Sequence, residues 1–227
     1  MNINLHGYRG FALQRGDNSK EAILLNVLLH GDVPLVRFPN TQEIPSDLIP
    51  CGSVEWIESI LGYHPVPDYY PEWVSKHLYR KVWKGDKWML GERVFVKPSD
   101  KYKRFTGFIT TDGYSKKKKP PYIFSEIVSF DNEWRYYISN GKVIETGWYS
   151  GDEINIPDAP TITGIDIPNG LCCAADFGTY NGKLCCVEVH HPFACGWYGN
   201  ISTDSSTYIQ WVIDGWLFMK DKESAKI

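Results

Sequence analysis

A carboxylate and an imidazole stand two positions apart near residue 190, in a segment whose composition predicts a β-strand. The segment Lys183–His190 ends in Glu188-Val189-His190. Alternate residues of a strand lie on one face, so the side chains of Glu188 and His190 would point the same way. Carboxylate oxygens are preferred ligands of hard cations such as Mg²⁺. A second carboxylate beside Glu188 would therefore indicate a cation site.

Asp176 is the candidate for that second carboxylate, and the preceding turn decides whether it faces Glu188. A two-residue turn at Asn181-Gly182 would put Asp176 on the wrong face. A three-residue loop over 180–182 would place it opposite Cys186 and diagonal to Glu188, about 7–8 Å away between Cα atoms. That arrangement favours a shared Mg²⁺ with phosphate as a partner. Two solvent-exposed acids on neighbouring strands are the alternative.

A lysine in another predicted strand could supply a positive charge. Lys97 ends the alternating segment Arg93–Lys97, immediately before Pro98. A lysine at a strand end can place its ammonium group on a phosphate. A lysine on a solvated strand edge is the alternative.

An acidic segment forms the third feature. Ser125-Glu126-Ile127-Val128 leaves a predicted strand, and Glu133 follows it. The backbone of Ile127 and Val128 could bind the edge of an adenine, while Glu133 could accept hydrogen bonds from ribose hydroxyls. A polar strand end that leads into a hairpin is the alternative.

The elements predicted around these residues fall into two groups joined by an extended linker at 64–74. The N-terminal group has an α/β order, with a loop around Pro50. Its predicted strands and helices are Leu5–Gln14, Ser19–Leu29, Pro34–Phe38 and Ser53–Leu61, the last ended by Gly62. The second group is mostly strands, with a turn at Asn140-Gly141. Its predicted strands are Arg93–Lys97, Phe105–Thr110, Tyr122–Val128, Arg135–Ser139, Lys142–Trp148, Leu171–Phe177 and Lys183–His190, followed by a helix at Thr203–Phe218.

The order of these features resembles the ATP-grasp fold. Three segments are similar to a clade of small, compact ATP-grasp proteins of bacteria and phages: Ile49–Glu55, Arg93–Gly107 and Ser125–Arg135. The resemblance implies an α+β fold in which two subdomains with antiparallel sheets grip a nucleotide. It also implies a reduced N-terminal α/β lobe at 1–75, followed by an ATP-grasp domain at 76–227.

The resemblance further implies an ATP-dependent ligase that joins a carboxylate to an amine or peptide acceptor through an acylphosphate. Its cofactors would be ATP and Mg²⁺, or Mn²⁺. The positions that match nucleotide-binding residues are Lys97, Glu126, Ile127, Val128 and Glu133. Those that match metal ligands are Asp176, Glu188 and His190. Those that match catalytic positions are Arg135, Lys103 and Arg104, the last two on a loop over the phosphates.

Two positions depart from the family pattern. His190 stands where an asparagine is usual, and neutral imidazole suits Mn²⁺ better than Mg²⁺. Ala174 stands where an arginine is common, two residues before the aspartate. The departures leave open a degenerate nucleotide-binding protein without catalysis.

Two further interpretations come from other residue types. The pair His190-His191 could belong to a transition-metal site of a hydrolase or oxygenase, with a further ligand from His6, His30, His64 or His77. The nine tryptophans and fourteen tyrosines could form a carbohydrate-binding platform near Trp197-Tyr198. Lys97 argues against a sugar site, which has no use for a buried cation facing two carboxylates.

The composition excludes several classes of protein. With 227 residues, 43% of them hydrophobic, the chain can bury a core and is neither disordered nor fibrous. Its net charge of −3 argues against a nucleic-acid binder. Short apolar runs and an N-terminus without a signal-peptide pattern predict a cytoplasmic protein with no membrane contact. The six cysteines lack metal-binding spacing and are expected to be buried thiols. The run Lys116–Lys119 is expected to be a solvated loop.

Overall fold

The computed structural model contains three β-sheets within the part of the 227-residue chain that it describes. The described residues are 3–17, 22–25, 33–40, 42–63, 68–86, 92–99, 105–111, 121–193, 195–199 and 205–221. Among them, no helix combines the length and the apolar character needed to cross a membrane.

The N-terminal residues form a small parallel sheet. Its strands are β1 (Gly10–Gln14), β2 (Leu35–Phe38) and β3 (Leu48–Cys51), in the order β2-β1-β3. The first two agree with prediction, although β1 covers only the second half of its predicted segment. The loop predicted around Pro50 is wrong, because Pro50 pairs with Ala12 in β3. β3 is an edge strand, where a residue without a backbone N–H is tolerated.

A helix follows this sheet where the sequence predicts it. α2 (Val54–Leu61) is capped by the hydroxyl of Ser53, which accepts a hydrogen bond from a first-turn N–H at 3.3 Å. Gly62 ends the helix in the left-handed region, with φ of 72°. Residues 22–25 are also helical, inside the helix predicted at 19–29, whose other residues lie outside the described part of the chain.

A second, antiparallel sheet follows. Its strands are β4 (Val82–Gly85), β5 (Val94–Pro98), β6 (Phe108–Thr110) and β7 (Tyr122–Ser125), in the order β4-β7-β5-β6. A 3-10 helix, η1 (Glu72–His77), precedes it. The last three strands were predicted, with β6 and β7 shorter than expected. Neither β4 nor η1 was predicted from the sequence.

The central sheet is also antiparallel and has the order β11-β10-β8-β9. Its strands are β8 (Glu133–Ser139), β9 (Lys142–Ser150), β10 (Cys173–Tyr180) and β11 (Lys183–His190). The C-terminal helix α3 (Ser205–Lys220) completes the fold. All five elements were predicted, and the bounds of β11 agree with the prediction.

The hairpin between β8 and β9 has the predicted two-residue turn. Ser139 pairs with Lys142, and Asn140 and Gly141 have φ values of 49° and 73°. Positive φ at both central residues is the type I′ geometry that matches the twist of paired strands.

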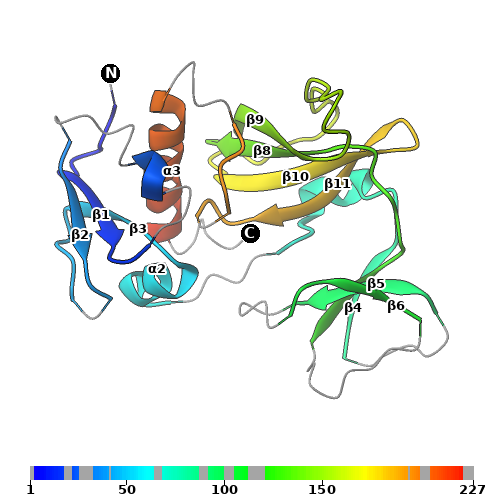
Figure 1. The fold of residues 1–227 in the computed structure, drawn as a ribbon, viewed down its shortest axis with the longest axis horizontal. Helices are drawn as coiled ribbons and strands as arrows, with labels where there is room; N and C mark the ends of the chain where they lie inside the picture. Colours follow the sequence, from blue (N-terminus) through cyan, green and yellow to red (C-terminus); the bar gives the residue numbers. More distant parts are fainter. Residues whose placement is uncertain are drawn as a thin grey trace.

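The N-terminal sheet and the central sheet share one hydrophobic core. Buried residues from the first sheet, from α3 and from the central sheet belong to a single cluster that includes Phe11, Ile49, Ile209, Tyr137 and Cys173. Figure 1 shows α3 between these two sheets. The β4–β7 sheet has a separate small core of Val94, Val96, Tyr122 and Phe124. The two cores place the β4–β7 sheet on the far side of the central sheet from α3 (Figure 1).

One glycine of the central sheet permits a close backbone approach. Gly147 in β9 lies opposite Arg135 in β8. A Cβ atom at position 147 would lie 2.3 Å from the backbone carbonyl of Tyr198. The absence of a side chain at Gly147 therefore lets the segment around Tyr198 lie against the sheet beside Arg135.

We expect Gly147→Ala to lower the free energy of unfolding by about 1–3 kcal/mol, because overpacking must displace backbone. Gly85→Ala in β4 is the matched control, since its Cβ would only touch the ring of Phe124 at 3.5 Å. The control should be neutral or gain about 0.4–1 kcal/mol. Urea unfolding measures both variants, and equal stabilities would contradict the close approach at Gly147.

Candidate active site

The turn between β10 and β11 differs from the three-residue loop expected from the sequence. Tyr180 pairs with Lys183, so the turn contains only Asn181 and Gly182, with φ values of 50° and 70°. The three-residue prediction is wrong. An Asn-Gly pair favours the type I′ turn found here. With regular pairing, this turn would put the two carboxylates on opposite faces of the sheet.

A β-bulge in β11 brings the carboxylates back to one face. Phe177 pairs with Cys186, but the next pair is Asp176 with Glu188, which leaves Val187 as an extra residue. An extra residue reverses the alternation of faces beyond it. Asp176 and Glu188 therefore lie directly opposite each other, closer than the predicted diagonal. No residue type in β11 signals the bulge, so the alignment was attributed to the turn instead.

Arg80 binds the backbone of this bulge. Its Nη1 donates to the carbonyl of Cys186 at 2.6 Å, and its Nη2 donates to the carbonyl of Val187 at 3.0 Å. The guanidinium group also lies over the rings of Tyr70 and Phe130, at 5.6 and 5.7 Å. A bulge interrupts the hydrogen-bond ladder, and a guanidinium fork satisfies two carbonyls at once. Arg80 was not predicted as a site residue, because nothing near it in sequence points to β11.

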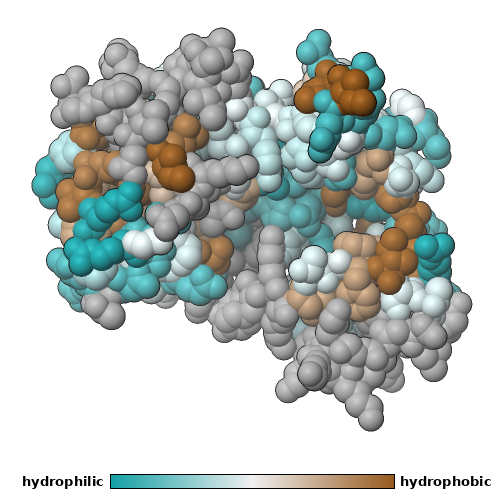
Figure 2. Space-filling model, in the orientation of Figure 1, coloured by the Kyte–Doolittle hydropathy of each residue, from teal (hydrophilic) through white to brown (hydrophobic). Residues whose placement is uncertain are grey.

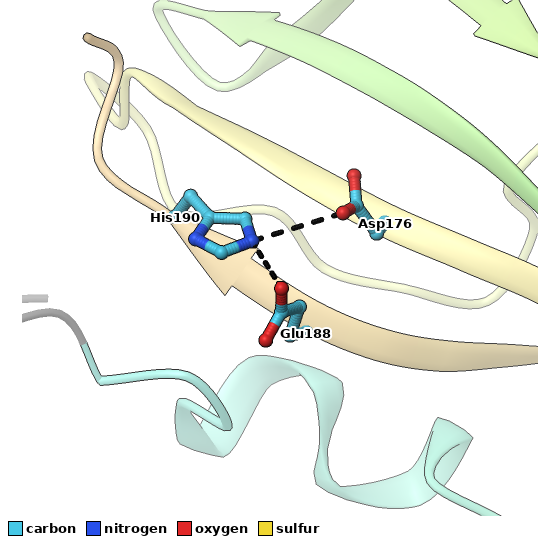
Figure 3. A group of neighbouring side chains, drawn as sticks. All are labelled: Asp176, Glu188 and His190. Carbon is cyan, nitrogen blue, oxygen red and sulfur yellow. Dashed lines mark ion pairs between the residues drawn. The ribbon is translucent and has the colours of Figure 1, made fainter. Parts of the chain in front are cut away.

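Asp176, Glu188 and His190 form one compact cluster (Figure 3). One ligand atom from each lies within 4.8 Å of the other two. His190 Nε2 is 2.5 Å from Glu188 Oε1 and 3.7 Å from Asp176 Oδ2. Figure 3 shows His190 and Glu188 on β11 with Asp176 beside them on β10. Two carboxylates and an imidazole at this spacing are a donor set that fits a divalent cation.

Two buried cations balance the two carboxylates. Lys97 Nζ donates to Glu188 Oε2 at 2.5 Å. Arg135 donates through Nε and Nη2 to both oxygens of Asp176, each at 2.7 Å. Asp176 is only 2% exposed. An unpaired charge at such a depth would cost several kcal/mol, so the pairing explains why the cluster can be buried. A paired carboxylate keeps further lone pairs for a cation.

Lys97 lies in β5, so its ion pair connects the β4–β7 sheet to the central sheet. The rings of Tyr69 and Tyr70 lie 4.2 and 4.7 Å from its ammonium nitrogen. Burial lowers the pKa of Lys97, but the Glu188 carboxylate and the Tyr70 hydroxyl outweigh burial and raise that pKa. The Val189 N–H donates to the Tyr69 carbonyl at 3.0 Å, which fixes the tyrosine segment beside β11. Both tyrosines were expected in a linker.

Arg135 is held between aromatic rings. Those of Tyr198 and Tyr149 lie 5.4 and 5.7 Å from its guanidinium carbon. Burial lowers the pKa of Arg135, but the hydrogen bonds and charge of Asp176 raise it above its usual range. Nη1 is the guanidinium nitrogen turned away from Asp176, and it reaches the carbonyl of Gly196 at 3.5 Å.

A cavity of about 370 Å³ lies between the β4–β7 sheet and the central sheet, with Lys97 and Glu188 in its wall. Its lining also includes Phe95, Ile109 and the segment 125–128. Figure 2 shows the surface hollowed between these two sheets, with hydrophobic side chains along part of the hollow. The volume is within the range of small-molecule sites.

The other predicted nucleotide-binding residues line the same cavity. Glu133 accepts a hydrogen bond from the Tyr149 hydroxyl at 2.8 Å. Burial raises the pKa of Glu133, and the hydrogen bond from Tyr149 offsets only part of that rise. Glu126 lies at the rim, where its exposed carboxylate accepts from the backbone N–H of Lys81 at 2.8 Å. Ile127 and Val128 complete this wall.

Residues 73–210 match the family model of an ATP-grasp domain, the second family of its clade. The chain belongs to this ATP-grasp family. The matched residues include every side chain of the cluster and, apart from Tyr70, the whole lining of the cavity.

Solved structures show the same ATP-grasp fold. D-alanine–D-alanine ligase from Bacillus anthracis, complexed with ATP, aligns with a TM-score of 0.54 at 12% identity, over 95% of this chain and 99% of that one. N5-carboxyaminoimidazole ribonucleotide synthetase from Thermotoga maritima aligns with a TM-score of 0.50 at 14% identity, over 89% and 74%. No curated protein matches the chain in sequence.

The structure brings together most of the residues that were selected from the sequence for an ATP-grasp site. Those in the charged cluster are Lys97, Arg135, Asp176, Glu188 and His190. Those that line only the adjoining cavity are Glu126, Ile127, Val128 and Glu133. Lys103 and Arg104 lie outside the described part of the chain, as does the run at 116–119. The roles of all these residues stay predictions.

The geometry does not favour the two competing interpretations. His191 stacks on Phe193 at 6.0 Å, and no second histidine joins the cluster among the described residues. Trp197 is buried in the core, with its ring 4.1 Å from that of Tyr137. A buried indole cannot serve as a platform for a sugar ring.

We expect Arg80→Met to lower the free energy of unfolding by about 1–3 kcal/mol, because two carbonyls of the bulge lose a charged donor. Arg9→Met is the matched control, since Arg9 forms an exposed ion pair with Asp47. The control should change stability by less than about 0.5 kcal/mol. Amide hydrogen exchange at Val187 and Glu188 should accelerate only in Arg80→Met, and equal exchange in the two variants would contradict the role given to Arg80.

The pH dependence of stability offers a second test of the cluster. Burial raises the pKa of Glu188, but His190 and Lys97 outweigh burial and lower it well below 4.5. A depressed pKa means that stabilisation by ionised Glu188 is complete above about pH 4.5 and is lost as the pH falls through the folded-state pKa.

We expect Glu188→Gln to be less stable than the wild type by about 1–3 kcal/mol at pH 7, since Lys97 and His190 lose an anion. The difference should shrink as the pH falls below 4.5. Urea unfolding between pH 3 and pH 7 measures it. A difference that stays constant down to pH 3 would argue that the Glu188 carboxylate does not titrate with a depressed pKa.

Proposed function

We propose that the protein is an ATP-dependent ligase that joins a carboxylate to an amine through an acylphosphate. The observation that carries the proposal is the charge-balanced cluster in the wall of the cavity. Lys97 and Arg135 supply cations, while Asp176 and Glu188 supply ligands for a divalent ion. Cations and cation ligands are both needed to bind a triphosphate and transfer its terminal phosphoryl group.

The cavity supplies the remaining contacts for a nucleotide. Phe95 and Ile109 offer apolar surface for an adenine ring, and the backbone at Ile127 and Val128 offers hydrogen bonds to its edge. Glu133 would accept hydrogen bonds from the ribose hydroxyls. The family match supports this assignment. The related ligase from Bacillus anthracis was solved with ATP, although the low identity makes that likeness one of fold.

Asp176 and Glu188 would hold Mg²⁺ through carboxylate oxygens, with His190 as a third ligand. When bound, the ion neutralises charge on the phosphates and orients them. Imidazole is a softer ligand than an amide oxygen, so Mn²⁺ should replace Mg²⁺ readily.

Lys97 would change partner when a nucleotide binds. Its ammonium group is held by Glu188 and lies against two tyrosine rings. A triphosphate in the cavity would offer a stronger anion, while the tyrosine rings keep the ammonium group on this wall. Lys97 then neutralises phosphate charge as the phosphoryl group moves.

The reaction requires positioning and charge stabilisation rather than a protein nucleophile. An oxygen of the substrate carboxylate attacks the γ-phosphorus, the bond to the β-phosphate oxygen breaks, and ADP leaves. An amine then attacks the acyl carbon, inorganic phosphate leaves, and the amine loses a proton as the amide forms. Arg135 would hold the substrate carboxylate or the transferred phosphoryl group through Nη1.

We expect saturating Mg²⁺-ATP, at about a hundred times its Kd, to stabilise the wild type by about 2.7 kcal/mol. Lys97→Met should lose most of this stabilisation, because a phosphate loses its cation. Lys142→Met is the matched control, since Lys142 is exposed on β9 away from the cavity. Thermal unfolding with and without Mg²⁺-ATP measures all three proteins.

An equal shift in Lys97→Met and in the wild type would contradict the assigned phosphate contact. ADP release with mixtures of carboxylates and amines separates a ligase from a protein that only binds the nucleotide. Binding of Mg²⁺-ATP without turnover of any carboxylate and amine would favour the binding protein.

A further inference from the structure

A second cavity, of about 360 Å³, lies next to α3 in the shared core. Segments from three parts of the chain line it: the end of β3 with the start of α2, residues 192–196, and one side of α3. Its wall is mostly apolar. The apolar lining includes Pro50, Ile57, Phe193, Trp211, Val212 and Trp216. The nucleotide contacts proposed above use none of these residues.

Arg135 connects this apolar cavity to the charged cluster. Nε and Nη2 of Arg135 are bound to Asp176, so Nη1 is the nitrogen turned towards the apolar cavity. It reaches the carbonyl of Gly196, a residue of the cavity wall, at a long 3.5 Å. The same carbonyl accepts a shorter bond, of 2.7 Å, from the Tyr137 hydroxyl. Nη1 can therefore exchange its weak contact for a stronger acceptor.

Gly196 keeps the passage beside Arg135 narrow but open. It has φ of 75°, which favours glycine. A Cβ there would lie 3.6 Å from Arg135 Nη1 and 3.3 Å from the ring of Tyr198. A small anionic group can approach Nη1 here because no side chain occupies the position.

We propose that the apolar cavity binds the hydrophobic side chain of the carboxylate substrate, whose carboxylate reaches Nη1 of Arg135. This inference rests on the proposed ligase function and names its substrate class. The substrate is a carboxylate with an apolar group of amino-acid size beside it. The volume is near the lower limit of about 300 Å³ for small-molecule sites, which suits one side chain and its backbone.

The lining selects against charged side chains. Burying an apolar group gains roughly 25 cal/mol for each Å² removed from water. A charged group would lose its hydration in this cavity without enough polar partners. Among the described residues of the wall, Asp17 is the only one with a carboxylate, and it lies beside Cys51. Asp17 would repel an acidic side chain. A free hydrophobic amino acid and the C-terminal residue of a peptide share the required chemistry.

The test uses hydroxylamine as a general amine, so that no natural acceptor has to be known. The wild type is incubated with Mg²⁺-ATP, hydroxylamine and one probe: L-leucine, L-phenylalanine, Gly-Gly-Leu, L-glutamate or L-lysine. ADP release and hydroxamate formation are measured. We expect at least tenfold more product with an apolar probe than with L-glutamate or L-lysine. Activity with Gly-Gly-Leu but not with L-leucine would identify a peptide substrate.

A binding measurement without nucleotide gives a second readout. N-acetyl-L-phenylalanine and N-acetyl-L-leucine should raise the Tm of the wild type, and N-acetyl-L-glutamate should not. Val212→Phe places a larger side chain in the cavity from α3 and should abolish the effect of the apolar probes. The shift caused by Mg²⁺-ATP should stay unchanged.

Two variants serve as controls. Val143→Phe makes the same change on exposed β9, outside the cavity lining, and should behave as the wild type. Val212→Leu is a milder filling substitution in case Val212→Phe fails to fold, and it should weaken probe binding by several-fold.

The outcomes separate the two proposals. Binding of Mg²⁺-ATP together with a preference for L-glutamate or L-lysine, or no probe binding, would overturn the apolar-substrate inference and leave the ligase intact. Binding of apolar probes that Val212→Phe removes, in a protein without a Mg²⁺-ATP shift, would retain the apolar site and overturn the ligase.

Discussion

The alignment of two carboxylates on one sheet face is the constraint on which the site depends. A type I′ turn at Asn181-Gly182 by itself would separate Asp176 from Glu188, and a single extra residue, Val187, reverses that outcome. Arg80 binds the carbonyls that the bulge exposes. The segment that precedes β4 therefore determines which side chains of β11 face the cavity.

Charge balance is the second organising feature. Asp176 with Arg135 and Glu188 with Lys97 form two close pairs that allow four charges to lie inside the protein. Because Lys97 belongs to the β4–β7 sheet, the second pair also connects two sheets with separate hydrophobic cores. The same contact thus links the closeness of the two sheets to the electrostatics of the cavity between them.

Sequence alone predicts the features that local chemistry determines. The caps of α2 at Ser53 and Gly62 and the turn at Asn140-Gly141 follow from residues that act on their own backbone. The strand that contains Pro50 was missed because its partner is distant in sequence, and a proline is tolerated there only at a sheet edge. The site residues were selected through family resemblance, but the bulge that aligns them depends on Arg80, whose contacts are formed only in the folded chain.

A structure of the protein with Mg²⁺ and a non-hydrolysable ATP analogue tests the central claim most directly. We expect a metal ion about 2.0–2.1 Å from oxygens of Asp176 and Glu188. We also expect that Lys97 Nζ has left Glu188 for a phosphate oxygen, with the adenine in the cavity beside residues 125–128. A nucleotide bound elsewhere, with no ion at the cluster and the pair of Lys97 with Glu188 intact, would contradict the claim.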